Sequence, residues 1–160
     1  MSAAGQVVNS ASAPETLALG RRLGAAARPG DVVALVGDLG TGKTHLAKGM
    51  AEGLDAARAH DVTSPTFVLC HEYLDGRIPF YHIDAYRLRG AADLEALGSD
   101  DLLAGDGLAA VEWADRVAEA LPPDVLEVRL VVTGETSRRL TLAPRGPASE
   151  RLLAEALRKA

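Results

Sequence analysis

The sequence has 160 residues, of which 48% are hydrophobic and 24% are charged, and its formal net charge at pH 7 is −5. This length suits one domain with its own core, so we expect a single domain over residues 1–160. The chain has no cluster of Lys or Arg, only one cysteine and no apolar run of the roughly 20 residues that a membrane helix needs, so we expect a cytoplasmic protein without an extended nucleic-acid surface.

The first predicted elements lead to an apolar strand. Residues 1–11 are small and polar around a short apolar pair, and form either a frayed end or a short edge strand. Ser12 and Glu15 have the spacing of a capping box, which predicts a helix over residues 14–27. The strand predicted at 32–36 is wholly apolar, which is typical of a central strand in a sheet.

A glycine-rich turn follows that strand. Residues 37–44 read Gly-Asp-Leu-Gly-Thr-Gly-Lys-Thr and fit G-x-x-x-x-G-K-[ST] between a predicted strand and a predicted helix. In such a loop the backbone N–H groups surround a phosphate chain, Lys43 reaches the outer phosphates and the Thr44 hydroxyl binds Mg²⁺. The alternative is a glycine-rich turn with an accidental lysine. The other loop residues that we expect to contact phosphate are Asp38, Leu39, Gly40, Thr41 and Gly42.

The remaining elements alternate between helices, buried strands and hairpins. Apolar spacing extends the loop helix to residue 53 or 54, and Asp75-Gly76 is typical of a hairpin turn. Strands are predicted at 67–73, 78–84, 108–111, 125–132 and 138–142, and helices at 91–97, 100–103, 114–121 and around 152–157. This pattern predicts an α/β fold in which antiparallel hairpins accompany the βα units.

Two carboxylates come at the ends of predicted strands. Asp84 ends the strand over 78–84, and Glu112 directly follows the strand over 108–111. In an open α/β sheet, ligands bind beyond the carboxyl ends of the strands, which is also where the glycine-rich loop lies. We expect Asp84 to act on the metal side, and Glu112 to hold a metal-bound water or to act as general base. The alternative is that each carboxylate only caps the next helix.

The hydroxyl-rich stretch 63–66 occupies the place in the chain order where GTPases carry their phosphate-sensing switch, although an ordinary Ser-Pro turn would look similar. His82 is more typical of a packed or surface histidine than of a catalyst. Asn9 is the only asparagine, so the N-K-x-D guanine signature of GTPases is absent and adenine is favoured.

Taken together, these motifs resemble the TsaE (YjeE) family, bacterial ATPases needed to make threonylcarbamoyladenosine in tRNA. The resemblance rests on Glu15-Thr16, residues 37–44, Ser64-Pro65-Thr66-Phe67, residues 81–88 and Val111-Glu112-Trp113. It implies a three-layer P-loop NTPase fold with a mixed central sheet that includes antiparallel hairpins. It also implies ATP with Mg²⁺, slow hydrolysis, and association with the TsaB and TsaD proteins, through which tRNA would be reached indirectly.

The resemblance also implies roles for individual residues. Lys43, Asp84 and Glu112 would be catalytic, and Thr44, Asp84 and Glu112 would lie at the metal. Further nucleotide contacts would come from Thr16, His45, Ser64, Thr66, Trp113 and Arg139. His45 stands where the family commonly has a second threonine, so we expect altered nucleotide affinity rather than lost binding.

Two other functions remain open at this point. A small-molecule P-loop kinase would need a lid with arginines, for which Arg87 and Arg89 are the only nearby pair. A non-catalytic adaptor would signal through its bound nucleotide and would need no hydrolysis.

Overall fold

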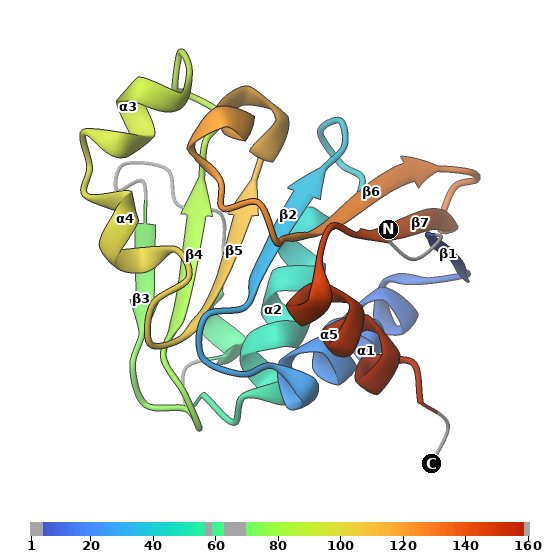
Figure 1. The fold of residues 1–160 in the computed structure, drawn as a ribbon. Helices are drawn as coiled ribbons and strands as arrows, with labels where there is room; N and C mark the ends of the chain where they lie inside the picture. Colours follow the sequence, from blue (N-terminus) through green and yellow to red (C-terminus); the bar gives the residue numbers. More distant parts are fainter. Residues whose placement is uncertain (1–4, 57–58, 63–69, 159–160) are drawn as a thin grey trace.

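A seven-stranded mixed sheet forms the centre of the protein in a computed structural model that describes residues 5–56, 59–62 and 70–158. The strand order is β1-β7-β6-β2-β5-β4-β3 (Figure 1). The strands are β1 (Gln6–Ser10), β2 (Val32–Val36), β3 (Cys70–Tyr73), β4 (Phe80–Asp84), β5 (Leu108–Glu112), β6 (Leu126–Val132) and β7 (Arg138–Pro144). The α/β fold expected of a P-loop NTPase is therefore present.

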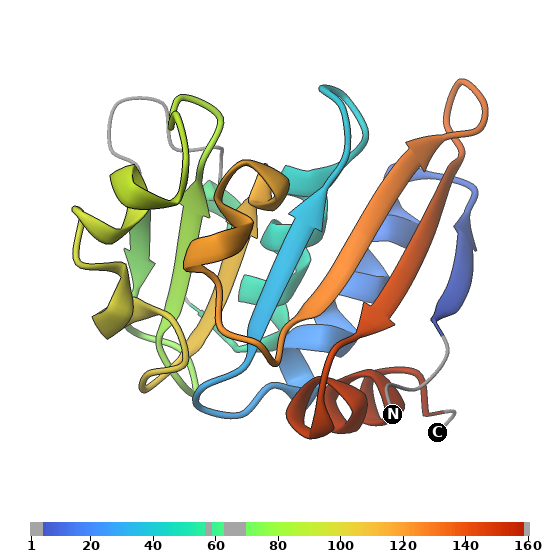
Figure 2. The same cartoon turned by 45° about the horizontal axis from the view of Figure 1, so that its top comes forward.

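The middle of the sheet is parallel and its edges are antiparallel. Strands β6, β2, β5 and β4 pair in parallel, so their carboxyl ends meet at one edge of the sheet, the upper one in Figure 2. Every residue of β2, β4 and β5 is buried, as their apolar sequences predict for strands covered on both faces. The predicted hairpins are confirmed as the antiparallel pairs β3–β4 and β6–β7, and β1 pairs with β7 at the outer edge.

Helices cover both faces of the parallel strands. They are α1 (Ala13–Ala26), α2 (Lys43–Gly53), η1 (Ala59–Asp61), α3 (Ala91–Glu95), α4 (Ser99–Leu102), η2 (Ala114–Ala120) and α5 (Pro147–Ala156). Figure 2 shows α3, α4 and η2 on one face and α1 and α2 on the other. The helix predicted at 114–121 is a 3₁₀ helix interrupted at Val117, whose φ of −127° is not helical. Within the described residues, none of the helices has both the length and the apolar character that crossing a membrane requires.

Helices α1 and α2 touch backbone to backbone through glycines. A Cβ added to Gly20 would lie 2.3 Å from the carbonyl oxygen of Leu46, and a Cβ added to Gly49 would lie 2.2 Å from the carbonyl oxygen of Leu17. Real Cβ atoms essentially never approach other atoms so closely. The crossing therefore depends on glycine, and it fixes α2, whose first residue, Lys43, belongs to the glycine-rich loop.

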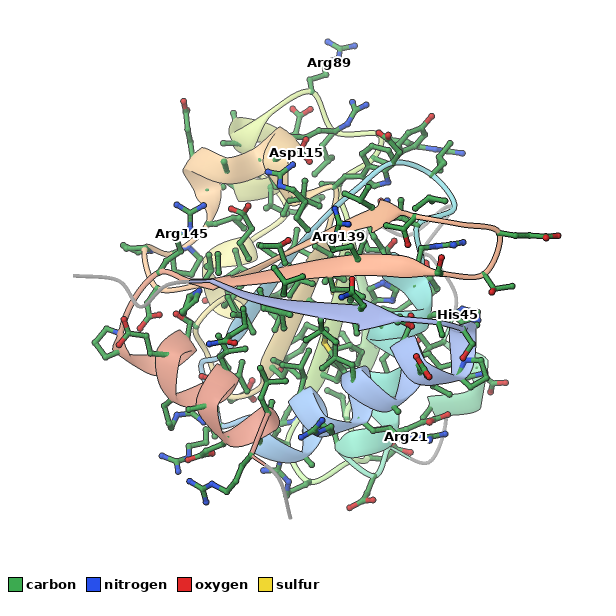
Figure 3. The ribbon with its side chains drawn as sticks, turned by 90° about the vertical axis from the view of Figure 1, so that its right-hand side faces the viewer. Arg21, His45, Arg89, Asp115, Arg139 and Arg145 are labelled. Carbon is green, nitrogen blue, oxygen red and sulfur yellow. The ribbon has the colours of Figure 1, made fainter. Side chains whose placement is uncertain are left out.

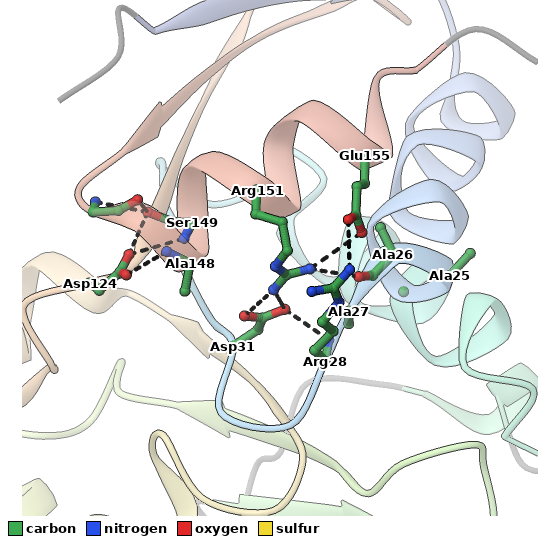
Figure 4. Close-up of polar contacts among 12 residues, drawn as sticks. Ala25, Ala26, Ala27, Arg28, Asp31, Asp124, Ala148, Ser149, Arg151 and Glu155 are labelled. Carbon is green, nitrogen blue, oxygen red and sulfur yellow. Dashed lines mark hydrogen bonds and ion pairs between the residues drawn. The ribbon is translucent and has the colours of Figure 1, made fainter.

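An arginine network holds α5 at the end of the sheet away from that loop (Figure 4). Arg151 donates to both oxygens of Asp31, at 2.7 and 2.6 Å, and to the carbonyl of Ala26 at 3.1 Å. Arg28 donates to Glu155 at 2.8 Å. These contacts join α5 to the end of α1 and to the turn that leads into β2.

Asp124 caps the start of α5. Its carboxylate accepts hydrogen bonds from the backbone N–H of Ala148 at 2.7 Å and from the backbone and hydroxyl of Ser149 at 3.0 and 2.6 Å (Figure 4). Burial acts to raise the pKa of Asp124, but these hydrogen bonds lower it below its usual value. The charged form of this side chain is therefore favoured in the folded protein.

Replacing Asp124 with alanine is expected to reduce the free energy of unfolding by about 1 to 2 kcal/mol at neutral pH. A carboxylate whose pKa falls on folding stabilises above its unfolded pKa, and this contribution is lost as the pH falls through the folded pKa. The difference between wild type and Asp124→Ala should therefore shrink below about pH 4. Urea unfolding at several pH values measures this, with Asp124→Asn as control, since it keeps one acceptor oxygen. A difference that does not change with pH would contradict the capping role of the charged carboxylate.

Candidate functional site

The glycine-rich loop connects β2 to α2 at the carboxyl edge of the sheet. Gly40 and Gly42 have φ values of 79° and 103°, in the left-handed region that favours glycine. The Thr41 hydroxyl donates to the carbonyl of Asp38 at 2.8 Å and closes the turn. Helix α2 begins at Lys43, so the loop lies at a helix N-terminus, where backbone N–H groups and the helix dipole favour a phosphate.

Lys43 lies inside this loop rather than in solvent. Its Nζ donates to the carbonyl oxygens of Gly37 at 2.5 Å and Asp38 at 2.9 Å, and lies 4.2 Å from the ring centroid of Trp113. Burial lowers the pKa of Lys43, while the nearby carboxylates, Glu112 first, act against that shift. A charged ligand would have to draw the amine away from these carbonyls.

The two strand-end carboxylates are direct neighbours. Asp84 and Glu112 face each other in the register of β4 and β5, and both are buried. Both oxygens of Glu112 lie 3.2 Å from the Thr44 hydroxyl, which donates to them. Burial raises the pKa of Asp84, an effect opposed by the hydrogen bond from the backbone N–H of Tyr86. Two acids and the loop hydroxyl therefore gather at one place.

Two aromatic side chains, Tyr86 and Trp113, pack against each other beside these acids. Trp113, directly after Glu112, has a φ of 58°, which is strained for a bulky residue and turns the chain sharply at the end of β5. Its ring centroid lies 5.0 Å from that of Tyr86, and Arg116 lies over both rings. Trp113 thus contacts both Tyr86 and Lys43.

A cavity of about 540 Å³ opens over these groups. It is lined by parts of the loop, the strand ends, the start of α1 and the β6–β7 hairpin: Ala13, Thr16, Leu39, Gly40, Thr41, Gly42, Lys43, Thr44, His45, Asp84, Tyr86, Glu112, Trp113, Glu135, Thr136 and Arg138. Among the described residues, only Asp38 and Arg139 of the predicted site are not part of this lining. Ser64, Thr66 and the rest of the predicted switch fall in the range 63–69, outside the described residues.

The structure places Arg138, rather than Arg139, at the loop. Arg138 donates to the Gly40 carbonyl at 3.1 Å, whereas Arg139 is exposed on β7. Alternate residues of a strand face opposite sides of the sheet, so Arg139 lies on the face away from the loop helix; Figure 3 shows Arg139 on β7 and His45 near the start of α2.

Several lining residues were missed by the sequence reasoning, namely Ala13, Tyr86, Glu135, Thr136 and Arg138. The hairpin residues follow the carboxyl end of β6, which pairs in parallel with β2 and so ends at the same edge. The sequence predicted the hairpin but not that pairing. Tyr86 lies within the motif 81–88 and could have been found there.

The donors in this cavity fit a hard cation beside phosphates. Thr44, Asp84 and Glu112 offer only oxygen atoms, which Mg²⁺ prefers, and it commonly takes few protein ligands and completes its shell with phosphate and water. The described residues contain no cluster of three or more His, Cys, Asp or Glu that would hold a metal by itself. Thr44, Asp84 and Glu112 could hold such a cation together with phosphate and water ligands.

Comparison with known proteins gives consistent matches over most of the chain. The family model "Threonylcarbamoyl adenosine biosynthesis protein TsaE" matches residues 10–140. The tRNA threonylcarbamoyladenosine biosynthesis protein TsaE of Bacillus subtilis is 43% identical over 141 residues, covering 88% of this chain and 87% of the relative. Its counterpart in Streptomyces coelicolor is 46% identical over 115 residues, covering 70% and 76%.

A solved structure agrees with these sequence matches. The crystal structure of Bacillus subtilis YdiB superposes with a TM-score of 0.81 at 36% sequence identity, covering 98% of this chain and 95% of that one. The resemblance inferred from the motifs is confirmed, because the family model spans both the loop and the strand-end acids. The chain therefore belongs to the TsaE family of threonylcarbamoyladenosine biosynthesis proteins.

Proposed function

We propose that this protein is the ATP-hydrolysing component of the machinery that makes threonylcarbamoyladenosine in tRNA, acting in the cytoplasm with TsaB and TsaD. The observation that carries the proposal is the contact between Thr44 of the loop and the buried carboxylate of Glu112. It joins a phosphate-binding element to an acid that can act on the terminal phosphate. The absent guanine signature favours adenine as the base.

In this proposal the chain's own groups bind and orient the triphosphate. The backbone N–H groups of the loop bind phosphate oxygens, and Lys43 leaves its carbonyl partners to contact the outer phosphates. Thr44 and the metal-side acid Asp84 would hold Mg²⁺, which would neutralise charge that develops on the phosphate oxygens. Glu112 orients water and accepts its proton as the bond from water to the terminal phosphorus forms and the bond to ADP breaks.

The kinase alternative finds less support. A phosphate-transferring kinase needs arginines around the transferred group and a pocket for the acceptor. Arg87 and Arg89, the pair that the sequence offered, are exposed, and neither belongs to the described lining of the cavity. Arg138 does line the cavity, but its guanidinium donates to the backbone carbonyls of Gly40, Gly134 and Ser137. A panel of small alcohols and acids with ATP tests this alternative, and an acceptor that is phosphorylated efficiently would overturn the ATPase proposal.

A pull-down with purified TsaB and TsaD, with and without ATP, tests the partnership. We expect this protein to be retained by the two partners and retention to increase with ATP, since a bound triphosphate would join the loop, the strand ends and the β6–β7 hairpin that line the cavity. Lys43→Ala is the matched control, because it removes the phosphate contact and should abolish the increase. Absence of retention under both conditions would refute the partner assignment, and retention that ignores ATP would refute its nucleotide dependence.

A further inference from the structure

His82 is a buried imidazole that the mechanism above does not use. It lies in the middle of β4, has no exposed surface, and its Nε2 is 2.5 Å from Oε2 of Glu112. Its ring stacks on Phe80 with 14° between the planes. The side chain therefore has one polar contact and is otherwise packed as a core residue.

The strand register explains how the imidazole reaches Glu112. His82 is the direct partner of Ala110 on β5, and Asp84 is the partner of Glu112. His82 and Glu112 are thus diagonal neighbours on the same face of the sheet, within reach of long side chains.

The second ring nitrogen shows that the position is not optimised for packing alone. Nδ1 of His82 is buried and has no hydrogen-bond partner among the described residues. An unpaired buried polar atom costs stability, which an apolar side chain of similar size would avoid. An ionised carboxylate can only accept a hydrogen bond, so opposite ionised Glu112 the Nε2 atom of His82 carries the hydrogen and is the donor.

We propose that His82 is a positioning residue for Glu112, an inference that rests on the proposed ATPase function. The Glu112 carboxylate has two oxygens that both approach Thr44, and the hydrogen bond from His82 selects one rotation of the carboxylate plane. Both side chains of this pair are buried, with 0% of His82 and 3% of Glu112 exposed, so the hydrogen bond lies away from solvent. Hydrogen-bond partners behind a ligating or catalytic group commonly change metal affinity or activity by about 10- to 100-fold when removed.

Three substitutions separate positioning from packing. His82→Phe keeps an aromatic ring against Phe80 but removes the donor. His82→Gln keeps an N–H group near the place of Nε2. His71→Phe is the matched control, since His71 pairs with His82 in the register and lies one strand farther from Glu112.

The readouts are kcat and KM for ATP, the Mg²⁺ concentration that gives half-maximal binding of ATP, and the melting temperature. We expect His82→Phe to lower kcat about 10- to 100-fold and to raise the half-maximal Mg²⁺ concentration about 10-fold, with KM changed less than about threefold. His82→Gln should recover kcat to within about fivefold of wild type. His71→Phe should match wild type in all kinetic readouts.

Folded His82→Phe with wild-type kcat and Mg²⁺ dependence would overturn the proposal, and so would a folded His82→Gln that is as defective as His82→Phe. If His82→Phe does not fold, the smaller His82→Leu takes its place. If neither folds, His82→Gln decides alone: a kcat near that of wild type supports the proposal, and a loss of about 10-fold or more refutes it.

The test also separates this inference from the proposed function. A wild-type protein that binds ATP without hydrolysing it would refute the ATPase proposal, and the Mg²⁺ dependence of ATP binding would still decide the role of His82. Wild-type protein that binds no ATP would refute both.

Discussion

Replacement of Glu112 with alanine is expected to leave ATP bound while lowering its hydrolysis by about 100- to 10,000-fold. The loop N–H groups and Lys43, which bind phosphate in our proposal, are untouched by this change. The change removes the Glu112 carboxylate, which lies 3.2 Å from the Thr44 hydroxyl and can accept the proton of water. Steady-state phosphate release and equilibrium binding of ATP measure the two quantities separately, and the dissociation constant should change less than about threefold.

Two further variants sharpen this experiment. Glu95→Ala, which removes an exposed carboxylate on α3, should hydrolyse ATP as wild type does. Asp84→Asn distinguishes the two acids, since loss of the metal-side acid should raise the Mg²⁺ requirement while loss of Glu112 should mainly lower kcat. Full ATPase activity in Glu112→Ala would end the assignment of this residue.

Replacement of Gly20 with alanine is expected to reduce the free energy of unfolding by about 3 kcal/mol or more. The new Cβ would lie 2.3 Å from the carbonyl oxygen of Leu46 and 2.9 Å from the Cα of Gly49. Both are backbone atoms, so the clash is relieved only if the two helices move apart. Helix propensity acts in the opposite direction, since alanine in a helix is favoured over glycine by about 1 kcal/mol, so the sign of the result decides between the two effects.

Urea unfolding of Gly20→Ala and of Gly90→Ala provides the comparison. An added Cβ at Gly90 meets nothing within 4 Å, so this variant should lose less than about 1 kcal/mol. Because α2 begins at Lys43, we also expect weaker ATP binding in the Gly20 variant. Equal stability of the two variants would show that the helices can separate without cost.

The parts of the fold that sequence could predict are those set by local chemistry. The apolar run of β2 and the glycine-rich loop after it identify a central strand followed by a helix. The Ser12 and Glu15 spacing places the start of α1, where Ser12 accepts from the Glu15 N–H at 3.3 Å and Glu15 accepts from the Ala11 N–H. Asp84 and Glu112 were predicted to share one site with the loop, because ligands of an open α/β sheet bind beyond the carboxyl ends of the strands.

The parts that sequence could not predict depend on distant pairings. Which face of β7 meets the loop is set by its register with β6, and a shift of one residue exchanges Arg138 and Arg139. The apolar spacing of α1 and α2 predicted their buried faces but not that Gly20 and Gly49 would touch. His82 reads as an ordinary strand residue until the diagonal to Glu112 is seen.

The contact between Lys43 and Trp113 gives the protein an intrinsic optical probe. Trp113 is the only tryptophan in the sequence, so all indole fluorescence comes from one ring at the edge of the cavity. That ring lies 4.2 Å from the ammonium group of Lys43, which in our proposal moves when a phosphate chain enters. If Lys43 moves as proposed, we expect the emission of Trp113 to change with occupancy of the loop, so that titrations of the unlabelled wild-type chain and its variants can be followed by the same signal.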